Sequence, residues 1–276
     1  CSVPAILSTR RIETRSDRLV TIAVLPMMSC AGRLPIYMMF VSALFPSRLQ
    51  APVLFGIYAS GVLLALCCAR LLKNTLFKAP QRDSLHHMKR LRLPSLRKVG
   101  ILMWSRAFMY VRKAGTFILG ASIILWFLNT YPRPEEDTAP TNAAAMEHSY
   151  AGQIGHWMEP VTQVAGFDWK INSALVGAFA AKEIFVTQMG ILYAVEDGNS
   201  GPAAQQTLNA RLKASYTPLQ GISIMIFCLI ALPCIGTVTV AKREAGTWWF
   251  ALAQFAGLTV MGFVTATVVY QVGLLL

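Results

Sequence analysis

Three of the six cysteines lie close to prolines in segments that are otherwise apolar. Cys1 stands in C-S-V-P-A, Cys30 in P-M-M-S-C-A-G-R-L-P and Cys234 in A-L-P-C-I-G-T-V. Proline lacks a backbone N–H and leaves carbonyl oxygens unpaired, and such carbonyls persist at membrane depth only where they line a cavity or are buried in protein. Thiolates, freed carbonyls and the thioether of Met27 suit a transition metal better than magnesium or calcium. Cys1, Cys30, Cys234 and Met27 are therefore candidate metal ligands.

The alternative for any single cysteine is the role of a small hydrophobic residue packed in a helix. We assign that role to Cys67, Cys68 and Cys228, and spacing alone leaves it open for the other three. A disulfide framework is not expected, because five cysteines lie in apolar segments and the acidic segment 131–170 has none.

Lys182 and Glu183 interrupt the apolar segment 171–195 near its middle. Neighbouring residues point about 100° apart on a helix, so each charge needs a partner of its own. A charge at that depth faces a cavity or a partner. Glu183 is therefore the next candidate ligand after the cysteines, with a structural ion pair as the alternative.

Two further charged residues are expected to have structural roles. Glu244 follows Lys242 and Arg243, and an interfacial salt bridge explains it as well as metal binding does. Arg33 lies between two prolines that break the same apolar segment, where it would pair with a carboxylate or hold freed carbonyls.

The elements that must position these residues are membrane helices. The chain of 276 residues is 55% hydrophobic and only 14% charged, which excludes an ordinary soluble domain. Uncharged runs near the roughly 20 residues that a membrane helix needs cover 49–69, 114–132, 214–241 and 245–276. We predict an all-α, polytopic bundle of about six spans with broken or re-entrant helices.

The charge pattern predicts how the bundle is oriented. Twelve Lys or Arg residues and one acid lie between Arg70 and Lys113, so 73–112 should face the cytoplasm, whereas the acidic segment 131–170 should face outward. The net charge of +12 therefore indicates a membrane protein, and no nucleic-acid partner is expected. A full crossing at 171–195 would place Lys242 outside, and a re-entrant hairpin would reverse that; the sequence leaves both open.

Three regions follow from these patterns. Residues 1–72 form a first broken segment and the following membrane helix, 73–113 a basic linker, and 114–276 a second membrane region with the acidic outer loop. Within the linker, residues 97–112 are amphipathic and are predicted to lie along the membrane surface.

The quoted cysteine motifs resemble those of a known family. The stretch C-S-V-P-A-I-L-S-T-R-R-I-E-T-R-S-D-R-L and the following P-M-M-S-C-A-G-R-L-P-I-Y look like the first Gate motif of the FeoB-type bacterial ferrous iron transporters. The stretches A-G-F-D-W-K-I-N-S-A-L-V-G-A-F-A-A-K-E-I-F-V-T and L-P-C-I-G-T-V-T-V-A-K-R-E-A-G-T-W-W resemble the second Gate segment. The linker H-H-M-K-R-L-R-L-P-S and Ala231 depart from the family pattern, which weakens inferences about the linker.

The resemblance implies a permease module of the bacterial inner membrane that imports Fe(II) and is not an enzyme. It implies that Cys1, Cys30 and Cys234 are iron-pathway thiols and that GTP acts only through an N-terminal domain missing from this chain, which we interpret as a fragment. The implied partners are the lipid bilayer, Fe(II), a second copy of the chain and small cytoplasmic accessory proteins of iron uptake.

Three other functions stay open at this stage. A nucleoside-type solute carrier would share Gate-like segments, although the proline-flanked cysteines argue against it. A membrane-embedded metal-dependent enzyme using Glu183 would need a motif that the sequence lacks, since neither H-E-x-x-H nor G-x-S-x-G occurs. A scaffold without a permeation path is the third possibility.

Overall fold

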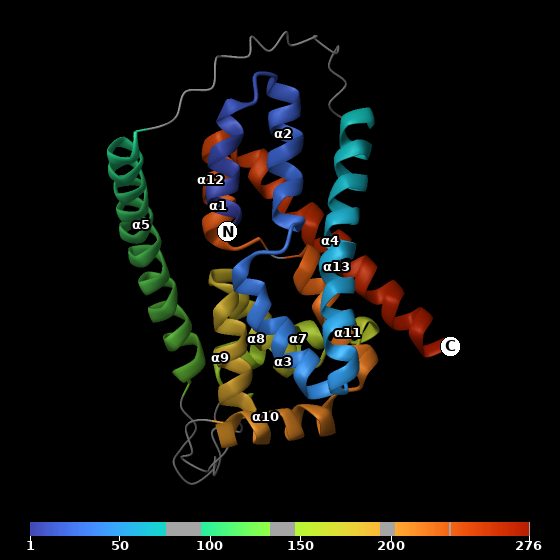
Figure 1. Cartoon of the computed structure of the whole chain (residues 1–276). Helices are drawn as coiled ribbons and strands as arrows, with labels where there is room; N and C mark the ends of the chain where they lie inside the picture. Colours follow the sequence, from blue (N-terminus) through green and yellow to red (C-terminus); the bar gives the residue numbers. More distant parts are fainter. Residues whose placement is uncertain (76–94, 133–146, 194–201, 232, 276) are drawn as a thin grey trace.

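The computed structural model describes residues 1–75, 95–132, 147–193, 202–231 and 233–275. All elements in these ranges are helical, which confirms the predicted all-α class (Figure 1). Four segments are long and apolar enough to cross a membrane, namely Arg15–Leu44, Ser47–Thr75, Pro218–Ala245 and Trp248–Leu275. Three of them contain or closely match runs that the sequence predicts as spans.

The first crossing segment is broken in its middle, as its prolines predict. Pro26 lies in the last turn before the break, and Pro35 lies in the first turn after it, where its fixed φ suits a helix start. Between them Cys30 has an extended backbone. The pieces are α2 (Arg15–Val24), the short turns η2 (Leu25–Met27) and η3 (Ala31–Arg33), and α3 (Leu34–Leu44).

A short helix precedes this broken segment. Helix α1 (Ser2–Ser8) starts near the level of the break and runs toward the end of the bundle where α2 begins (Figure 1). Helix α4 (Ser47–Thr75) returns to that same end after α3 and packs against both α2 and α3.

The segment around Lys182 folds as a hairpin rather than as one crossing. Helix α8 (Trp169–Ala180) ends at Ala181, whose backbone is extended, and α9 (Lys182–Tyr193) turns back along it. The amide of Gln188 donates a hydrogen bond of 3.0 Å to the Ser173 hydroxyl, which pairs residues about equally far from the turn. The hairpin is therefore re-entrant.

The two ends of this hairpin are tied together at one side of the bundle. The Tyr193 hydroxyl donates to the Tyr216 hydroxyl at 3.0 Å, and the Tyr216 hydroxyl donates to the Asp168 carboxylate at 2.9 Å. Asp168 also caps α8 by accepting from the amide of Ile171. Burial raises the pKa of the Asp168 carboxyl group, and these hydrogen bonds partly offset that rise. Asp168, Tyr193 and Tyr216 thus lie at the same end of the helical bundle.

The second broken crossing starts at this end and leads to the opposite one. Helix α11 (Pro218–Ile230) ends just before Pro233, and α12 (Ile235–Ala245) starts after Cys234. Helix α13 (Trp248–Leu275) returns alongside both pieces. Lys242 and Arg243 consequently lie at the opposite end of the bundle from Tyr216, as the re-entrant alternative predicts.

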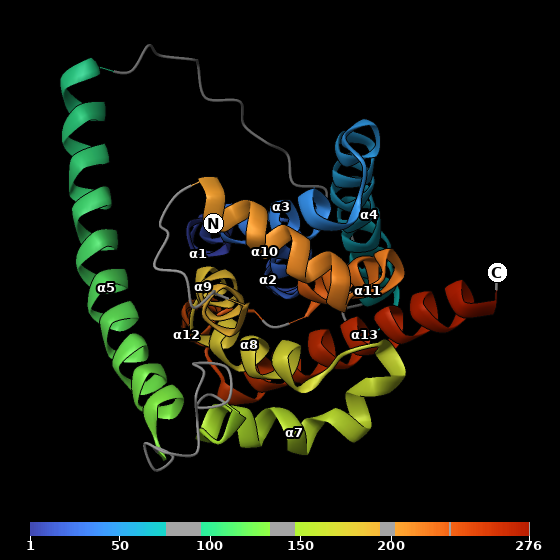
Figure 2. The same cartoon turned by 90° about the horizontal axis from the view of Figure 1, so that it is seen from below.

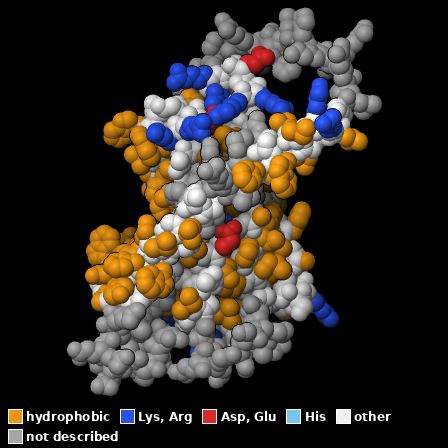
Figure 3. Space-filling model, turned by 90° about the vertical axis from the view of Figure 1, so that its left-hand side faces the viewer, with side chains coloured by type: hydrophobic (Ala, Val, Ile, Leu, Met, Phe, Trp, Pro, Cys, Tyr) orange, Lys and Arg blue, Asp and Glu red, His pale blue; other side chains and the backbone are white. Residues whose placement is uncertain are grey.

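Basic residues from distant parts of the chain gather at that opposite end. Arg10 and Arg18 contact Glu244 near the end of α12, and Lys73 at the end of α4 pairs with Asp17 at 3.0 Å. Figure 3 shows most of the visible Lys and Arg side chains at one end and hydrophobic side chains over the middle. This end fits the predicted cytoplasmic side.

The amphipathic stretch 97–112 and the predicted crossing at 114–132 belong to one element. Residues 96–130 form the continuous helix α5 (Leu96–Thr130), which no proline interrupts. Helix α5 stands apart from the bundle along most of its length and approaches it at one end, near α7 (Tyr150–Thr162) (Figures 1 and 2). There the Gln188 amide donates to Asn129 at 3.1 Å. The remaining linker residues 76–94 lie outside the described part of the chain.

A close approach between α7 and α8 supplies a test of this packing. A Cβ atom added at Gly155 would lie 2.5 Å from the Trp169 carbonyl oxygen, which is backbone and cannot turn aside. We expect Gly155→Ala to lower the free energy of unfolding by about 1–3 kcal/mol because the helices must separate. Thermal unfolding in detergent would measure this. Gly190→Ala, with no neighbour within 4 Å, is the matched control, and equal stability of both variants would contradict the packing.

Candidate functional site

The breaks in the two crossing segments and the turn of the hairpin meet at one level of the bundle. A Cβ atom added at Gly32 in η3 would lie 2.7 Å from Oε1 of Glu183, at the start of α9. The Lys182 ammonium donates hydrogen bonds to the carbonyl oxygens of Cys228 at 3.1 Å and Ala231 at 3.3 Å, at the end of α11. Three irregular stretches far apart in sequence are therefore neighbours.

The thiols of Cys30 and Cys234 belong to this region. Both interact electrostatically with Lys182, as does the buried thiol of Cys228. Cys30 and Cys234 are each partly exposed, and the Cys234 Sγ lies 3.2 Å from the Thr237 hydroxyl. The structure thus brings together two of the three predicted thiols and the predicted carboxylate.

Cys1 joins them because α1 and α12 lie side by side in parallel. Cys1 is the N-cap of α1 and Cys234 the N-cap of α12, and a Cβ atom at Gly236 would lie 3.8 Å from Cγ2 of Val3, two residues into each helix. The two N-terminal ends are therefore nearly in register.

Buried polar groups also occur at the first break. The Arg33 guanidinium is 2% exposed and donates to the Met28 carbonyl at 3.1 Å, which confirms that it holds a freed carbonyl. The Ser29 and Tyr37 hydroxyls are buried next to one another and form a side-chain hydrogen bond. Among the described residues, the Arg33 Nε is buried without a hydrogen-bond partner, and such an atom is commonly satisfied by water.

Met27 and Glu183 differ in accessibility. The Met27 side chain is 1% exposed and lies in the main hydrophobic core, where packing accounts for it, whereas its neighbour Met28 is 44% exposed. Glu183 is exposed, as is Cys1. Within the described part of the chain, no group of three or more His, Cys, Asp or Glu residues is arranged to hold a metal ion. The candidate ligands are thus near one another without forming a closed coordination shell.

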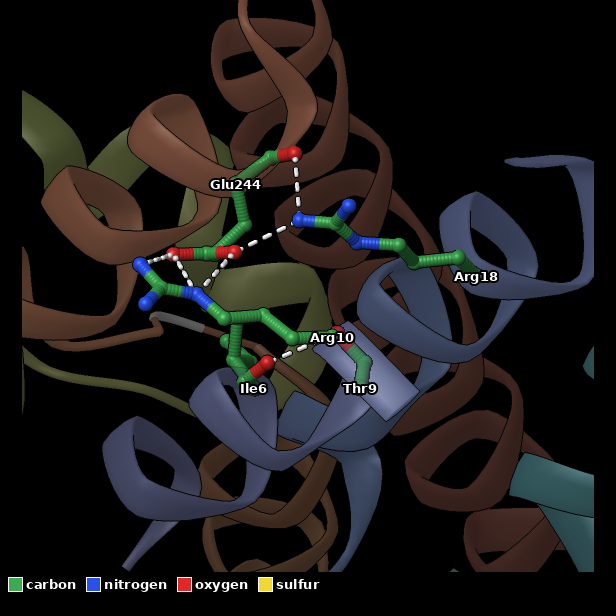
Figure 4. Close-up of polar contacts among 5 residues, drawn as sticks. All are labelled: Ile6, Thr9, Arg10, Arg18 and Glu244. Atoms are coloured by element: carbon green, nitrogen blue, oxygen red, sulfur yellow. Dashed lines mark hydrogen bonds and ion pairs between the residues drawn. The ribbon is translucent and has the colours of Figure 1, made fainter. Parts of the chain in front are cut away.

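The sequence did not reveal the partners of Glu244. Its side chain is 2% exposed and accepts hydrogen bonds from Arg10 on η1 (Thr9–Arg11) and from Arg18 on α2, as Figure 4 shows. The prediction of an ion pair is confirmed, but the carboxylate is buried beneath the partly exposed arginines, which come from the first segment rather than from Lys242 and Arg243. Glu244 raises the pKa of the Arg10 guanidinium through these hydrogen bonds.

Arg10, Arg18 and Glu244, which we call the clamp, connect the first segment of the chain to α12. The clamp fixes the far ends of the parallel helices α1 and α12, whose near ends carry Cys1 and Cys234. A cavity of about 340 Å³ lies beside it and is lined by Arg15, Arg18, Arg243 and Glu244, among others. The sequence signals for the clamp are the alternating charges of residues 10–18 and the acidic Glu244, which follows Lys242 and Arg243 in a chain with few acids.

Two family profiles together cover most of the chain. The family described as "Nucleoside recognition" (Gate) matches residues 111–248, half of the chain. The family described as "Ferrous iron transport protein B C terminus" matches residues 54–106. No solved structure matches the chain significantly.

Curated relatives match along the whole chain. A protein named "Fe(2+) transport protein A/Fe(2+) transporter FeoB fusion protein" from Porphyromonas gingivalis is 34% identical over 100% of this chain and 37% of its own length. "Fe(2+) transporter FeoB" proteins from Campylobacter jejuni and Methanocaldococcus jannaschii are each 35% identical, over 96% and 100% of this chain and 43% and 40% of their own lengths. The chain thus spans less than half the length of these relatives. It belongs to the Gate family and corresponds, within that family, to the C-terminal membrane region of FeoB-type ferrous iron transporters.

Proposed function

We propose that this chain is the membrane module through which a longer transporter imports Fe(II). The observation that carries the proposal is the meeting of two proline-broken helices and a re-entrant hairpin beside the thiols of Cys30 and Cys234. Broken helices at mid-depth are a recurring device for ion sites in transporters. The names of the relatives, which are Fe(2+) transporters, favour Fe(II) as the substrate.

In this proposal, Cys1, Cys30, Cys234 and Glu183 contact the ion in turn, and Met27 supports the first break through packing. Thiolate, carboxylate and carbonyl ligands suit Fe(II), and transport requires weak binding at several places so that the ion can leave again. The absence of a ready-made metal cluster among the described residues fits transient ligation of this kind. The module itself performs no chemical conversion.

The remaining parts of the proposal concern the complete protein. We infer that a GTP-binding domain outside this chain drives the cycle and that the module lies in the bacterial inner membrane, with a first region at 1–72, a linker at 73–113 and a second region at 114–276. The fusion named for Porphyromonas gingivalis favours a small accessory protein as a partner. A homo-oligomer is a further candidate assembly.

A nucleoside carrier is the second candidate, favoured by the description of the family that matches residues 111–248. Such a carrier would bind its solute through hydrogen bonds and apolar contacts and would not need thiols. Sensitivity to cysteine replacement therefore separates the two functions.

The deciding experiment measures anaerobic Fe(II) uptake by cells that express the complete protein. We expect Cys30→Ser and Cys234→Ser each to reduce uptake by about tenfold or more, since loss of metal-site groups commonly costs that much, and Cys1→Ser to reduce it as well. Cys67→Ser is the matched control, because Cys67 is exposed on α4 and flanks none of the prolines at the breaks. Full uptake by the triple variant at equal membrane abundance would refute the thiol pathway.

A further inference from the structure

Lys182 is a buried cation held by backbone carbonyls. Its side chain is 6% exposed, and its ammonium donates to the carbonyl oxygens of Cys228 and Ala231, which lie at the C-terminal end of α11. No carboxylate among the described residues forms a salt bridge with it. Among the described residues, Lys182 is thus held by carbonyl dipoles rather than by an acid, and the nearby Arg33 guanidinium repels its charge.

The carbonyls that hold Lys182 would also attract other cations. The last carbonyl groups of a helix lack helical partners and carry partial negative charge. In α11 they face the break that contains Cys234, next to Glu183 at the start of α9. We define the carbonyl oxygens of Cys228 and Ala231 as the carbonyl cradle.

A free cation that enters this break meets the cradle already occupied. Two positive charges so close together repel one another strongly in a region with little water. The incoming ion can therefore bind the carbonyl cradle only if the Lys182 ammonium leaves it. Glu183 is exposed and its carboxylate lies toward Gly32 in the first break, so it is available to the incoming cation.

From this geometry, and resting on the proposed function, we propose that Lys182 is a tethered cation that competes with Fe(II) for the carbonyl cradle. When no iron is present, the ammonium fills the cradle and satisfies its carbonyls. Iron replaces the ammonium during transit, and the returning ammonium helps to expel the iron. Lys182 thereby keeps iron binding weak enough for release.

A purely structural cap at the end of α11 would behave differently. If Lys182 only stabilised the break, its removal would leave iron binding unchanged or weaken it by loosening the site. Competition predicts the opposite sign, because an empty cradle binds a free cation more readily. The sign of the change in iron affinity therefore distinguishes the two roles.

The first test replaces the ammonium with an uncharged group of similar length. If the cradle of the wild type is free about one tenth of the time, the Lys182→Met variant of the complete protein should bind Fe(II) about tenfold more tightly. Its uptake at saturating Fe(II) should fall, since release becomes slower. Anaerobic equilibrium binding of Fe(II) to purified protein measures the first effect. An unchanged or weakened affinity would overturn the competition.

The second test uses Lys182→Arg and the wild type, so the result does not depend on one variant folding. A guanidinium forms more hydrogen bonds to carbonyls than an ammonium and is harder to displace, so Lys182→Arg should bind Fe(II) several-fold more weakly. In the wild type, Fe(II) should accelerate acetylation of Lys182, measured by peptide mass spectrometry, while the exposed Lys213 reacts at a constant rate.

These measurements separate the inference from the function on which it rests. If the wild type neither binds nor imports Fe(II), the proposed function is wrong. If the wild type binds and imports Fe(II) but the ion leaves the acetylation rate of Lys182 unchanged or lowers it, only the competition is refuted. Where both variants fail to accumulate, the acetylation result decides alone.

Discussion

Replacing both Arg10 and Arg18 by alanine should destabilise the protein far more than either single replacement. The Glu244 side chain is 2% exposed, and the double variant would leave its carboxylate without a charged partner. The cost is smaller than that of a fully buried unpaired charge, because the Arg10 side chain is 51% exposed and its removal opens the carboxylate to water. Each single variant retains one arginine on the carboxylate and should lose much less, so the two effects should be strongly non-additive.

Thermal unfolding in detergent, with all variants measured at one pH and salt concentration, checks this expectation. Arg11→Ala serves as the control, because Arg11 is exposed in the same turn and forms no ion pair with any residue that the structure describes. Adding Glu244→Gln to the double variant should restore part of the lost stability, since it removes the buried charge. Additive effects of the two single replacements would show that Glu244 finds other partners.

Glu183→Gln should abolish most Fe(II) uptake while leaving the fold intact. The carboxylate is exposed at the level of the breaks. It lies beside Gly32 and follows Lys182, which the carbonyl cradle holds. Glutamine keeps the size of the side chain but removes the negative charge that a divalent cation requires. We expect uptake to fall by about tenfold to a hundredfold, the usual range for lost groups at metal sites.

Gly32→Ala tests the position of that carboxylate without removing it. The added Cβ would lie 2.7 Å from Oε1 of Glu183, and the flexible end of the glutamate can move away. Uptake should therefore decrease although stability changes little. Gly257→Ala, on α13 with no neighbour within 4 Å, is the control. Normal uptake by both Glu183→Gln and Gly32→Ala would exclude Glu183 from the ion path.

The breaks in the crossing segments could be predicted from the sequence, whereas the hairpin could not. Each proline removes a backbone hydrogen-bond donor wherever it occurs, so the helix breaks at Pro26, Pro35 and Pro233 can be predicted from the local sequence alone. Hydropathy is the same for an apolar segment that crosses and for one that turns back. The hairpin depends on contacts such as those of Tyr216 with Asp168, which join residues 48 positions apart.

The site was predictable only where the chemistry belongs to side chains. Cys30, Cys234 and Glu183 are recognisable by type, and the structure places them together. The partners of Lys182 are backbone oxygens, which every residue has, so no sequence pattern marks them. The partners of Glu244 lie 226 and 234 residues away, and a charged stretch near the chain start looks solvated when read alone.

The pairing of the short helices has a consequence for how the molecule can work. Helix α1 packs on α12 at one end of the bundle, and α9 packs on α3 at the other. Each broken crossing also lies along the long helix that follows it, α4 or α13. Apart from α10 (Pro202–Ser215), which has no counterpart in the first half, the succession α1, α2, α3, α4 thus recurs in the opposite direction as α9, α11, α12, α13 (Figure 1). Inverted repeats of this kind occur in many transporters, where one half moves against the other around a fixed central site.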